Sequence, residues 1–255
     1  MDPLDEKIRK TMVGTIAEYN LLEQGDRVMV AVSGGKDSTI MLLQLEQIRR
    51  RAPFDFEIEP IMLDQKQPGF DAQRYSKWLL DQGFKLRIIE QDTYSVVVSQ
   101  TAPGKSYCGL CSRLRRGALY SLAHAEGFTK IALGHHREDL NETLLLNLFF
   151  SGVLGSMPAR LESDDGRNTV IRPMAEVGEA DLTRYASALE IPVIPCNLCG
   201  SQETARRAEM KALIGELESR YPGLRGSMLT AQKNLRPTQL MDLSFAESVE
   251  EEGAA

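Results

Sequence analysis

The stretch that most constrains the fold is residues 27–38, which join an apolar run to a glycine turn. The five residues 28–32 are all apolar, with charge before them and Gly34 and Gly35 after them. A strand that is buried on both faces of a sheet has this pattern. Residues 39–45 are apolar and compatible with a helix. The combination of strand, glycine turn and helix N-terminus predicts an anion site, because backbone N–H groups and the helix dipole both favour negative charge there.

The turn at residues 33–38 reads Ser-Gly-Gly-Lys-Asp-Ser. It is neither a Walker P-loop nor a Gly-x-Gly-x-x-Gly fingerprint. Its two glycines allow a close approach of the backbone to a ligand that a Cβ would block. An ordinary tight turn is the simpler alternative, but the full hexamer behind a buried strand favours a phosphate site. The residues that we expect to bind phosphate are Ser33, Gly34, Gly35, Lys36, Asp37 and Ser38, with Lys36 and Asp37 also as catalytic candidates.

Apolar runs and helical spacings alternate along the chain and predict an α/β fold. Strands are expected at 28–32, 58–63, 86–90, 130–133 and 170–173, with a short extended segment at 192–195. Helices are expected at 5–23, 39–51, 71–82, 112–126, 138–150 and 181–189. Such alternation predicts a parallel sheet covered by helices on both faces. Ligands of these sheets bind beyond the carboxyl ends of the strands. Ser33, Asp64 and Gly134 each follow an expected strand, so they should share one crevice.

All four cysteines belong to two Cys-x-x-Cys pairs, Cys108 with Cys111 and Cys196 with Cys199. This spacing lets two thiolates from one turn reach one metal. Three interpretations compete: a closed zinc site with four thiolates, an iron–sulfur cluster with three or four, and a redox pair. Buried apolar cysteines would not explain two matched pairs. The spacing alone favours zinc, which is the commoner structural metal.

Arginines follow the first cysteine pair at residues 113, 115 and 116. Cations lower the pKa of nearby thiols and attract phosphate. A solvated surface run explains such charges equally well. Arg115, about one helical turn after Cys111, is the candidate that would bind a phosphate group and act in catalysis.

Residues 132–139 form a third motif, Ala-Leu-Gly-His-His-Arg-Glu-Asp. Gly134 ends an expected strand, and Glu138 and Asp139 open an expected helix. Acidic side chains at a helix N-terminus suit the dipole, which is a sufficient structural explanation. They could also hold Mg²⁺ against a pyrophosphate. Two of the three histidines of the chain fall in this motif.

Composition sets the outer bounds of the interpretation. The 255 residues are 42% hydrophobic and 26% charged, as in a globular protein with a good core. No apolar run is long enough to span a bilayer, and the N-terminus lacks a signal peptide's apolar region, so we expect a cytoplasmic protein without membrane contact. The net charge of −6 argues against indiscriminate nucleic-acid binding but allows a local basic patch. The expected organisation is an N-terminal helix (1–24), a main domain (25–195), a small helical extension with the second cysteine pair (196–243) and a disordered acidic tail (244–255).

The motifs together resemble the TtcA family, the tRNA 2-thiocytidine synthetases of the PP-loop ATP pyrophosphatase superfamily. The resemblance covers about residues 28–237. It rests on the hexamer at 33–38, Cys-Gly-Leu-Cys-Ser-Arg-Leu-Arg-Arg-Gly, Leu-Gly-His-His-Arg-Glu-Asp and Pro-Cys-Asn-Leu-Cys-Gly-Ser-Gln. The family usually has an aspartate where this chain has Glu138, so Asp139 is the stronger candidate for a functional acid.

The resemblance implies a PP-loop fold of Rossmann type and ATP-dependent thiolation of cytidine 32 in a tRNA anticodon loop. The C2 oxygen would be adenylated, with release of pyrophosphate, and sulfur would then displace AMP. It also implies Mg²⁺, a sulfur donor such as a cysteine desulfurase, and a homodimer. The implied metal centre is a [4Fe–4S] cluster held by Cys108, Cys111 and Cys199, with Cys196 as a fourth candidate.

Two alternatives use the same motifs with zinc in place of an iron–sulfur cluster. One is another PP-loop tRNA-modifying ligase or thiolase with structural zinc. The other is not an enzyme but an RNA-binding zinc module with a vestigial nucleotide site. Iron and zinc analysis of anaerobically purified protein separates these alternatives from the sulfurtransferase.

Overall fold

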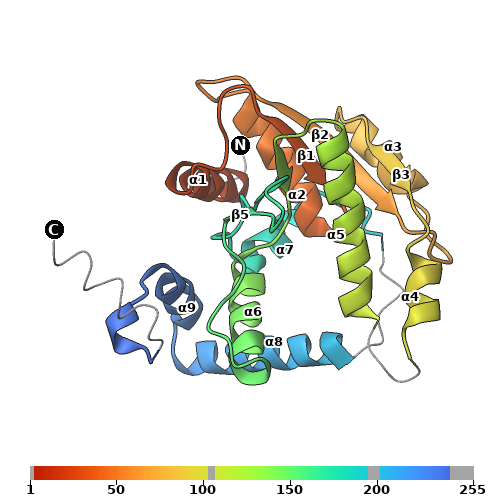
Figure 1. The fold of residues 1–255 in the computed structure, drawn as a ribbon. Coiled ribbons are helices and arrows are strands. Elements are labelled where there is room, and N and C mark those ends of the chain that lie inside the picture. Colours follow the sequence, from red (N-terminus) through yellow and green to blue (C-terminus); the bar gives the residue numbers. More distant parts are fainter. Residues whose placement is uncertain (1–2, 103–106, 195–201, 242–255) are drawn as a thin grey trace, which may run out of the picture.

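The computed structural model describes residues 3–102, 107–194 and 202–241, with the backbone alone for Cys108 and residues 202–205. Six strands form one sheet in the order β3-β2-β1-β4-β6-β5 (Figure 1). Their bounds are β1 Arg27–Ala31, β2 Glu57–Asp64, β3 Arg87–Glu90, β4 Lys130–Ala132, β5 Arg160–Glu162 and β6 Thr169–Ile171. All neighbours pair in parallel except β5, which runs antiparallel to β6 at the edge.

Helices connect the strands and cover both faces of the sheet. Their bounds are α1 Pro3–Glu18, α2 Lys36–Arg49, α3 Gln73–Asp81, α4 Tyr94–Gln100, α5 Cys108–Ala125, α6 Arg137–Phe150, α7 Glu179–Ala188, α8 Gln202–Arg220 and α9 Leu224–Lys233, followed by a 3-10 turn at Pro237–Gln239. The fold class predicted from the sequence, α/β with a helical C-terminal extension, is confirmed.

The alternation of side chains along β1 divides the core into two layers. Val28 and Val30 belong to a large cluster that includes buried residues of α1, α2, α3 and α7. Met29 points to the other face, where it joins a smaller cluster with Leu119 and Ala123 of α5. The apolar run is therefore buried on both faces, as its composition predicts. Helix α1 packs against α2 and α7, and its apolar residues lie inside the large cluster.

Two described elements escaped the sequence analysis. Strand β5 has only three residues, and Leu161 within it is 40% exposed, so it offers no apolar run to detect. Helix α4 contains three consecutive valines, which favour a strand rather than a helix. Of the expected extended segment at 192–195, residues 192–194 belong to no helix or strand, and residue 195 lies outside the described residues.

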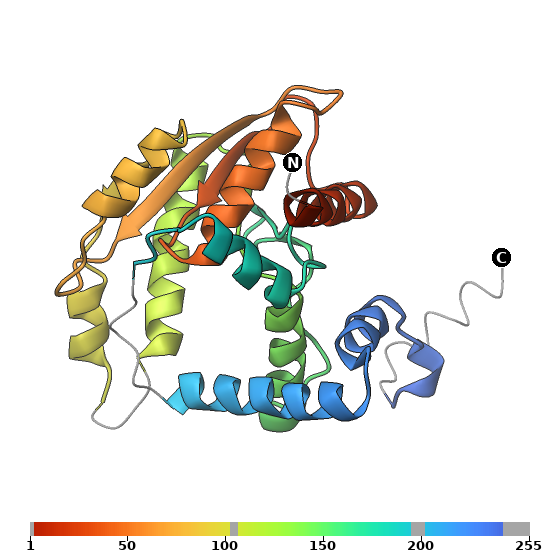
Figure 2. The ribbon, with the colours of Figure 1, turned by 180° about the vertical axis from the view of Figure 1, so that it is seen from behind.

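Helices α8 and α9 form the C-terminal extension and pack mainly on α6. The Asn141 side chain donates to the Arg225 carbonyl at 3.0 Å and accepts from Gln232 at 2.9 Å, which joins α6 to α9. Figure 2 shows α8 crossing the end of α6 on the side where the parallel strands end. Among the described residues, no helix has both the length and the apolar composition that crossing a membrane requires.

Candidate active site

The turn between β1 and α2 is held by its own serines. Ser38 Oγ accepts from the Ser33 N–H at 3.1 Å and donates to the Gly35 carbonyl at 3.1 Å. Ser33 Oγ accepts from the Gly35 N–H at 3.3 Å. Gly35 is the N-cap of α2, so the first turn of this helix opens directly at the loop. A helix N-terminus has backbone N–H groups without intrahelical partners, which an anion can accept.

A pocket of about 390 Å³ lies in front of this loop at the carboxyl edge of the sheet. The ends of β1, β2 and β4 contribute to its wall, together with the N-terminal parts of α2 and α6, the middle of α5 and the segment ending at Ile194. The strands are parallel, so their ends meet at one edge, as the sequence predicts.

Two glycines let the backbone close around this pocket. A Cβ on Gly134 would lie 2.9 Å from both the nitrogen and the Cα of Ser38, so the end of β4 touches the first turn of α2 directly. Gly34 has a positive φ of 79°, and a Cβ there would lie 2.7 Å from Ile194 Cδ1. The Ile194 N–H also donates to the Gly34 carbonyl at 3.0 Å. Both positions therefore require glycine.

The structure brings most of the predicted site residues together. The candidates that line the pocket are Ser33, Gly35, Asp37, Ser38, Arg115, Gly134 and Asp139. Three other described candidates, Gly34, Lys36 and Asp64, are not among its lining residues. Lys36 Nζ instead lies 2.8 Å from Asp37 Oδ1 and 3.7 Å from Glu179 Oε1.

The expectation that Asp64 shares this crevice is corrected by the alternation of β2. Leu63 and Gln65 line the pocket, and successive side chains of a strand point to opposite faces. Asp64 is the last residue of β2, and its carboxylate accepts from the Lys66 N–H at 2.7 Å. The sequence placed Asp64 at the correct edge of the sheet but did not show which way its side chain points.

The two acids at the start of α6 have different surroundings. Glu138 is 2% exposed, and its carboxylate accepts from Arg137 at 2.7 Å and from the Glu179 N–H at 2.7 Å. Burial alone would raise the pKa of Glu138, but hydrogen bonds from His136, Arg137 and the Glu179 amide together lower it well below its usual range. Asp139 accepts from the His136 N–H at 3.0 Å and lines the pocket. The Glu138 carboxylate is thus held by hydrogen bonds within the protein, while Asp139 faces the pocket.

His135 and Arg172 form a pair at the pocket that the sequence analysis did not find. Arg172 Nε donates to His135 Nδ1 at 3.2 Å, and His135 lines the pocket. Burial, with a further contribution from the Arg172 charge, lowers the pKa of His135 to about 4. The sequence signal was limited to the position of His135 just after one expected strand and of Arg172 near the end of another.

The cysteine predictions fall mostly outside the described part of the chain. Cys196, Cys199 and the side chain of Cys108 are not described. Cys108 begins α5, and Cys111 lies one turn further along. Cys111 Sγ donates to Gln65 Oε1 at 3.3 Å, and Gln65 lines the pocket. The first cysteine pair is therefore next to the candidate active site.

Comparison with known proteins assigns the chain to a family. The sequence matches the PP-loop domain family over residues 4–194. It is 49% identical over 240 residues to a tRNA-cytidine(32) 2-sulfurtransferase of Bdellovibrio bacteriovorus, covering 94% of this chain and 92% of that protein. The chain belongs to the PP-loop family of tRNA-cytidine 2-sulfurtransferases. The resemblance to the TtcA family is thereby confirmed.

Other relatives agree with this family assignment. A tRNA-cytidine(32) 2-sulfurtransferase of Burkholderia vietnamiensis is 53% identical over 239 residues, covering 94% of this chain and 71% of that protein. Among solved structures, the U34-tRNA thiolase NcsA of Methanococcus maripaludis, with its [4Fe-4S] cluster, superposes with a TM-score of 0.73 at 20% identity. That superposition covers 90% of this chain and 78% of NcsA and shows that the two share the PP-loop fold.

Proposed function

We propose that this protein transfers sulfur to C2 of cytidine 32 in tRNA and converts ATP to AMP and pyrophosphate. The observation that carries the proposal is one pocket in which the glycine loop, Arg115 and Asp139 meet beside Cys111. The family assignment supports the sulfurtransferase over the two alternatives, a zinc-containing ligase and an RNA-binding module.

The loop and the first turn of α2 would hold the phosphates of ATP. Gly34 and Gly134 keep the backbone closely packed around the loop, and the helix dipole favours the phosphate charge. Asp37 and Asp139 both line the pocket, and carboxylate oxygens are the ligands that Mg²⁺ prefers. These two residues therefore fit a Mg²⁺ ion bound with the nucleotide, in exchange for their present contacts, Asp37 with Lys36 and Asp139 with Arg207.

The proposed chemistry has two displacements. The C2 oxygen of the cytidine attacks the α-phosphorus of ATP, forming a C2–O–P bond while the bond to pyrophosphate breaks. A hydrosulfide nucleophile then attacks C2, and AMP leaves with the oxygen, because AMP is a far better leaving group than oxide. Arg115 would orient the α-phosphate, while Lys36 and the loop amides would stabilise the charge that develops on the phosphates.

The donor set of the first cysteine pair fits a metal cluster. Cys108 and Cys111 occupy the first turn of α5, where the helix dipole favours thiolates over thiols. We propose Cys108, Cys111 and Cys199 as ligands of a [4Fe–4S] cluster, with Cys196 as a fourth candidate. A cluster held by three thiolates would leave one iron open to a sulfur ligand, which a closed zinc site would not.

The substrate would be an anticodon loop, where bases are partly unstacked and extrusion of one base costs little. A cysteine desulfurase is the proposed sulfur donor, and a homodimer is the proposed assembly.

The test is a reaction of the anaerobically purified protein with unmodified tRNA, ATP, Mg²⁺ and sulfide. Nucleoside mass spectrometry measures 2-thiocytidine, and a coupled assay measures pyrophosphate. Gly35→Val should abolish both products while the protein still folds, because the larger side chain would obstruct the phosphates. Gly117→Ala is the matched control, since a Cβ at Gly117 meets nothing within 4 Å. Normal pyrophosphate release by Gly35→Val would refute the loop assignment.

The metal assignment is tested by iron and zinc content of the four single Cys→Ser variants. Variants of Cys108, Cys111 and Cys199 should lose iron and thiolation together, whereas the Cys196 variant should keep its cluster. Equal loss of iron from all four would refute the three-ligand proposal. Zinc in place of iron in the wild-type protein would refute sulfur transfer and favour the ligase.

A further inference from the structure

The pair of His135 and Arg172 fixes where the imidazole proton lies. Arg172 follows strand β6 and is 6% exposed. Its Nε lies 3.2 Å from His135 Nδ1, and its Nη1 donates to the Pro158 carbonyl at 2.6 Å. A guanidinium has only donors, so His135 Nδ1 must be the acceptor. A neutral imidazole carries one proton, which in this pair must therefore be on Nε2.

The charges around His135 favour this neutral form. The charged groups that act on the ring are the cations of Arg172, Arg115 and Arg207 and the carboxylate of Asp139. Burial and the Arg172 cation lower the pKa of His135 to about 4, so the ring is neutral at physiological pH. The ring can then only donate through Nε2, because its other nitrogen is occupied by Arg172.

The position of His135 places this donor beside the phosphate loop. His135 directly follows Gly134, whose Cα packs against the backbone of Ser38 in the first turn of α2. The same pocket contains Arg115 and Asp139. A neutral N–H that is fixed in a partly buried pocket can stabilise a developing oxyanion without adding a further cation beside two arginines.

We propose that Arg172 holds His135 as the Nε2–H tautomer, and that this N–H donates a hydrogen bond to an oxygen of the reacting phosphate of ATP. His135 is then a catalytic residue and Arg172 a positioning residue. This inference rests on the proposed adenylation, and it adds to that proposal a specific neutral donor.

Two substitutions of His135 test whether a hydrogen-bond donor is needed at the Nε2 position or whether any side chain that fills this space is enough. The carboxamide nitrogen of His135→Gln reaches close to the Nε2 position, whereas that of His135→Asn reaches only the Nδ1 position. We expect His135→Asn to lower kcat for pyrophosphate release about 100-fold, the loss typical of one oxyanion donor. His135→Gln should retain the rate within about tenfold, and the KM for ATP should change little in either variant.

The outcomes distinguish this inference from the proposed function. Equal rates for the Gln and Asn variants, whether both normal or both low, would overturn the role of the N–H. The proposed function would still stand in that case, provided that the wild-type protein releases pyrophosphate. Absence of pyrophosphate release by the wild-type protein would instead refute the proposed function. Thermal unfolding of each variant shows whether a lower rate reflects loss of the fold.

The tautomer is tested without any activity. In ¹⁵N spectra of histidine-labelled wild-type protein, the His135 ring should show an unprotonated Nδ1 and a protonated Nε2, assigned by loss of its signals in His135→Gln. Arg172→Met should give a mixture of His135 tautomers and a higher pKa of His135. The control is Arg167→Met, which changes an exposed arginine paired with Asp165 and should alter neither the tautomer nor the pKa of His135. A protonated Nδ1 in the wild-type protein would overturn the proposal even where Arg172→Met fails to fold.

Discussion

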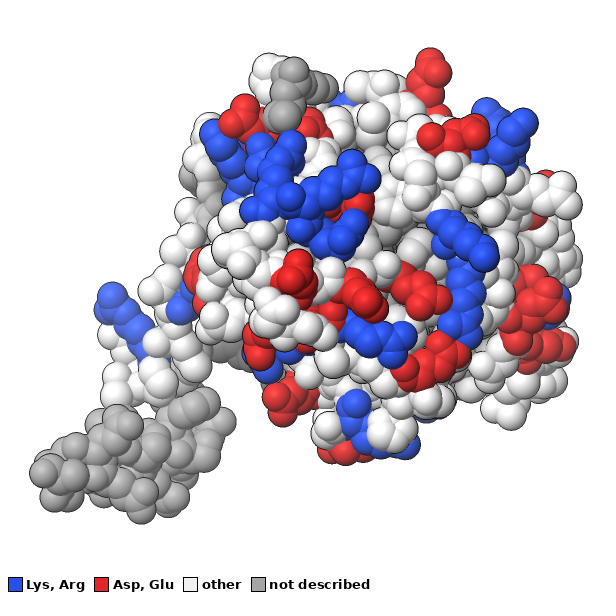
Figure 3. Space-filling view, turned by 90° about the horizontal axis from the view of Figure 1, so that it is seen from above, with Lys and Arg blue, Asp and Glu red and all other residues white. Residues whose placement is uncertain are grey.

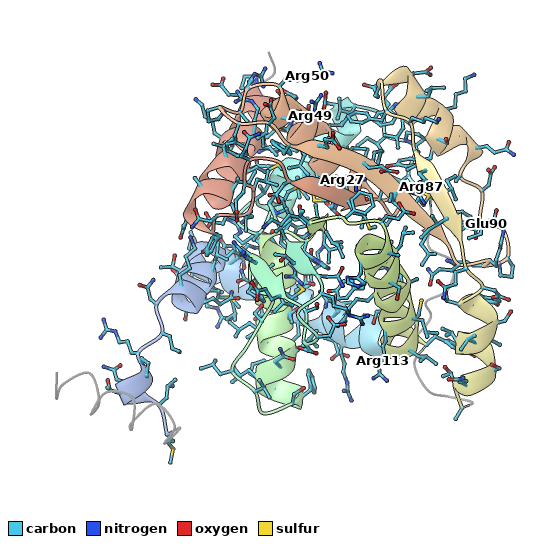
Figure 4. All side chains as sticks on the ribbon, turned by 45° about the horizontal axis from the view of Figure 1, so that its top comes forward. Arg27, Arg49, Arg50, Arg87, Glu90 and Arg113 are labelled. Atoms are coloured by element: carbon cyan, nitrogen blue, oxygen red, sulfur yellow. The ribbon has the colours of Figure 1, made fainter. Side chains whose placement is uncertain are left out.

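The two edges of the sheet carry cavities of different size and chemistry. The cavity at the amino edge has a volume of about 730 Å³, against about 390 Å³ for the pocket at the carboxyl edge. The larger cavity is lined by Arg27, Arg49, Arg50 and Arg87, which Figure 4 places around the start of the strands. In Figure 3 this side of the molecule shows Lys and Arg side chains beside Asp and Glu.

The arginines of the larger cavity already have partners within the protein. Arg49 and Arg50 both bind Glu46 at 2.7 Å. Arg87 binds Glu126 at 2.6 Å. Their charges therefore compensate locally. At the carboxyl edge, by contrast, a helix N-terminus and closely packed glycine backbone converge on the smaller pocket. Converging donors, rather than volume or the number of charges, therefore mark the candidate active site.

The largest expected effect that sharpens this contrast is at Asp139. Asp139→Asn keeps the size of the side chain but removes its charge, so we expect pyrophosphate release to fall about 100-fold or more, or about 2.7 kcal/mol in activation free energy. Excess Mg²⁺ should restore part of the rate. Glu126→Gln at the amino edge should leave the rate unchanged. If Asp139→Asn releases pyrophosphate at the wild-type rate, the Asp139 carboxylate interacts favourably with the helix dipole at the start of α6 but has no role in catalysis.

A smaller effect is expected from one methyl group at Gly134. Gly134→Ala places a Cβ against the backbone of Ser38, which must move, so we expect about 1–3 kcal/mol of lost stability and an increased KM for ATP. Gly83→Ala is the control at the other edge. Gly83 has a positive φ of 88° with nothing within 4 Å, so its substitution should cost about 1 kcal/mol of stability with an unchanged KM. Equal KM changes in both variants would contradict the direct contact with the phosphate loop.

The third effect concerns stability against acid. The folded-state pKa of Glu138 lies below its usual value, so its contribution to stability is complete above about pH 4.5 and is lost as the pH falls further. At pH 7 we expect Glu138→Gln to lower the free energy of unfolding by about 1.5 kcal/mol, because the carboxamide keeps the packing but loses the charge of the hydrogen-bonded carboxylate. Urea unfolding at several pH values should show the difference between wild type and variant shrinking below pH 4.5. A difference that is constant with pH would exclude this electrostatic origin.

The smallest effect is expected at Arg87. Arg87→Met removes a partly exposed ion pair, which contributes less than about 1 kcal/mol and less still at high salt. Thiolation should be unchanged. A large increase in the KM for tRNA with a steep salt dependence would instead make the amino edge a second RNA contact.

Sequence reasoning succeeded where local pattern decides the structure. The apolar run before Ser33 predicted a strand buried on both faces, and the glycines after it predicted the turn at the head of α2. It failed where the answer depends on register or distant partners. The direction of the Asp64 side chain depends on where β2 ends. The hydrogen bond of His135 depends on the pairing of β4 with β6, which places Arg172 beside His135 although the two are 37 residues apart in the chain.

The contact between Ile194 and Gly34 would join the proposed nucleotide site and the proposed cysteine site into a single thermodynamic system. Ile194 is hydrogen-bonded to Gly34 of the phosphate loop and stands two positions before Cys196 in the chain. To the extent that a bound phosphate displaces the Gly34 carbonyl, it also displaces the start of the segment that carries the second cysteine pair. Linkage then requires reciprocity: occupation of those cysteines must change the affinity for ATP by the same factor as ATP changes theirs.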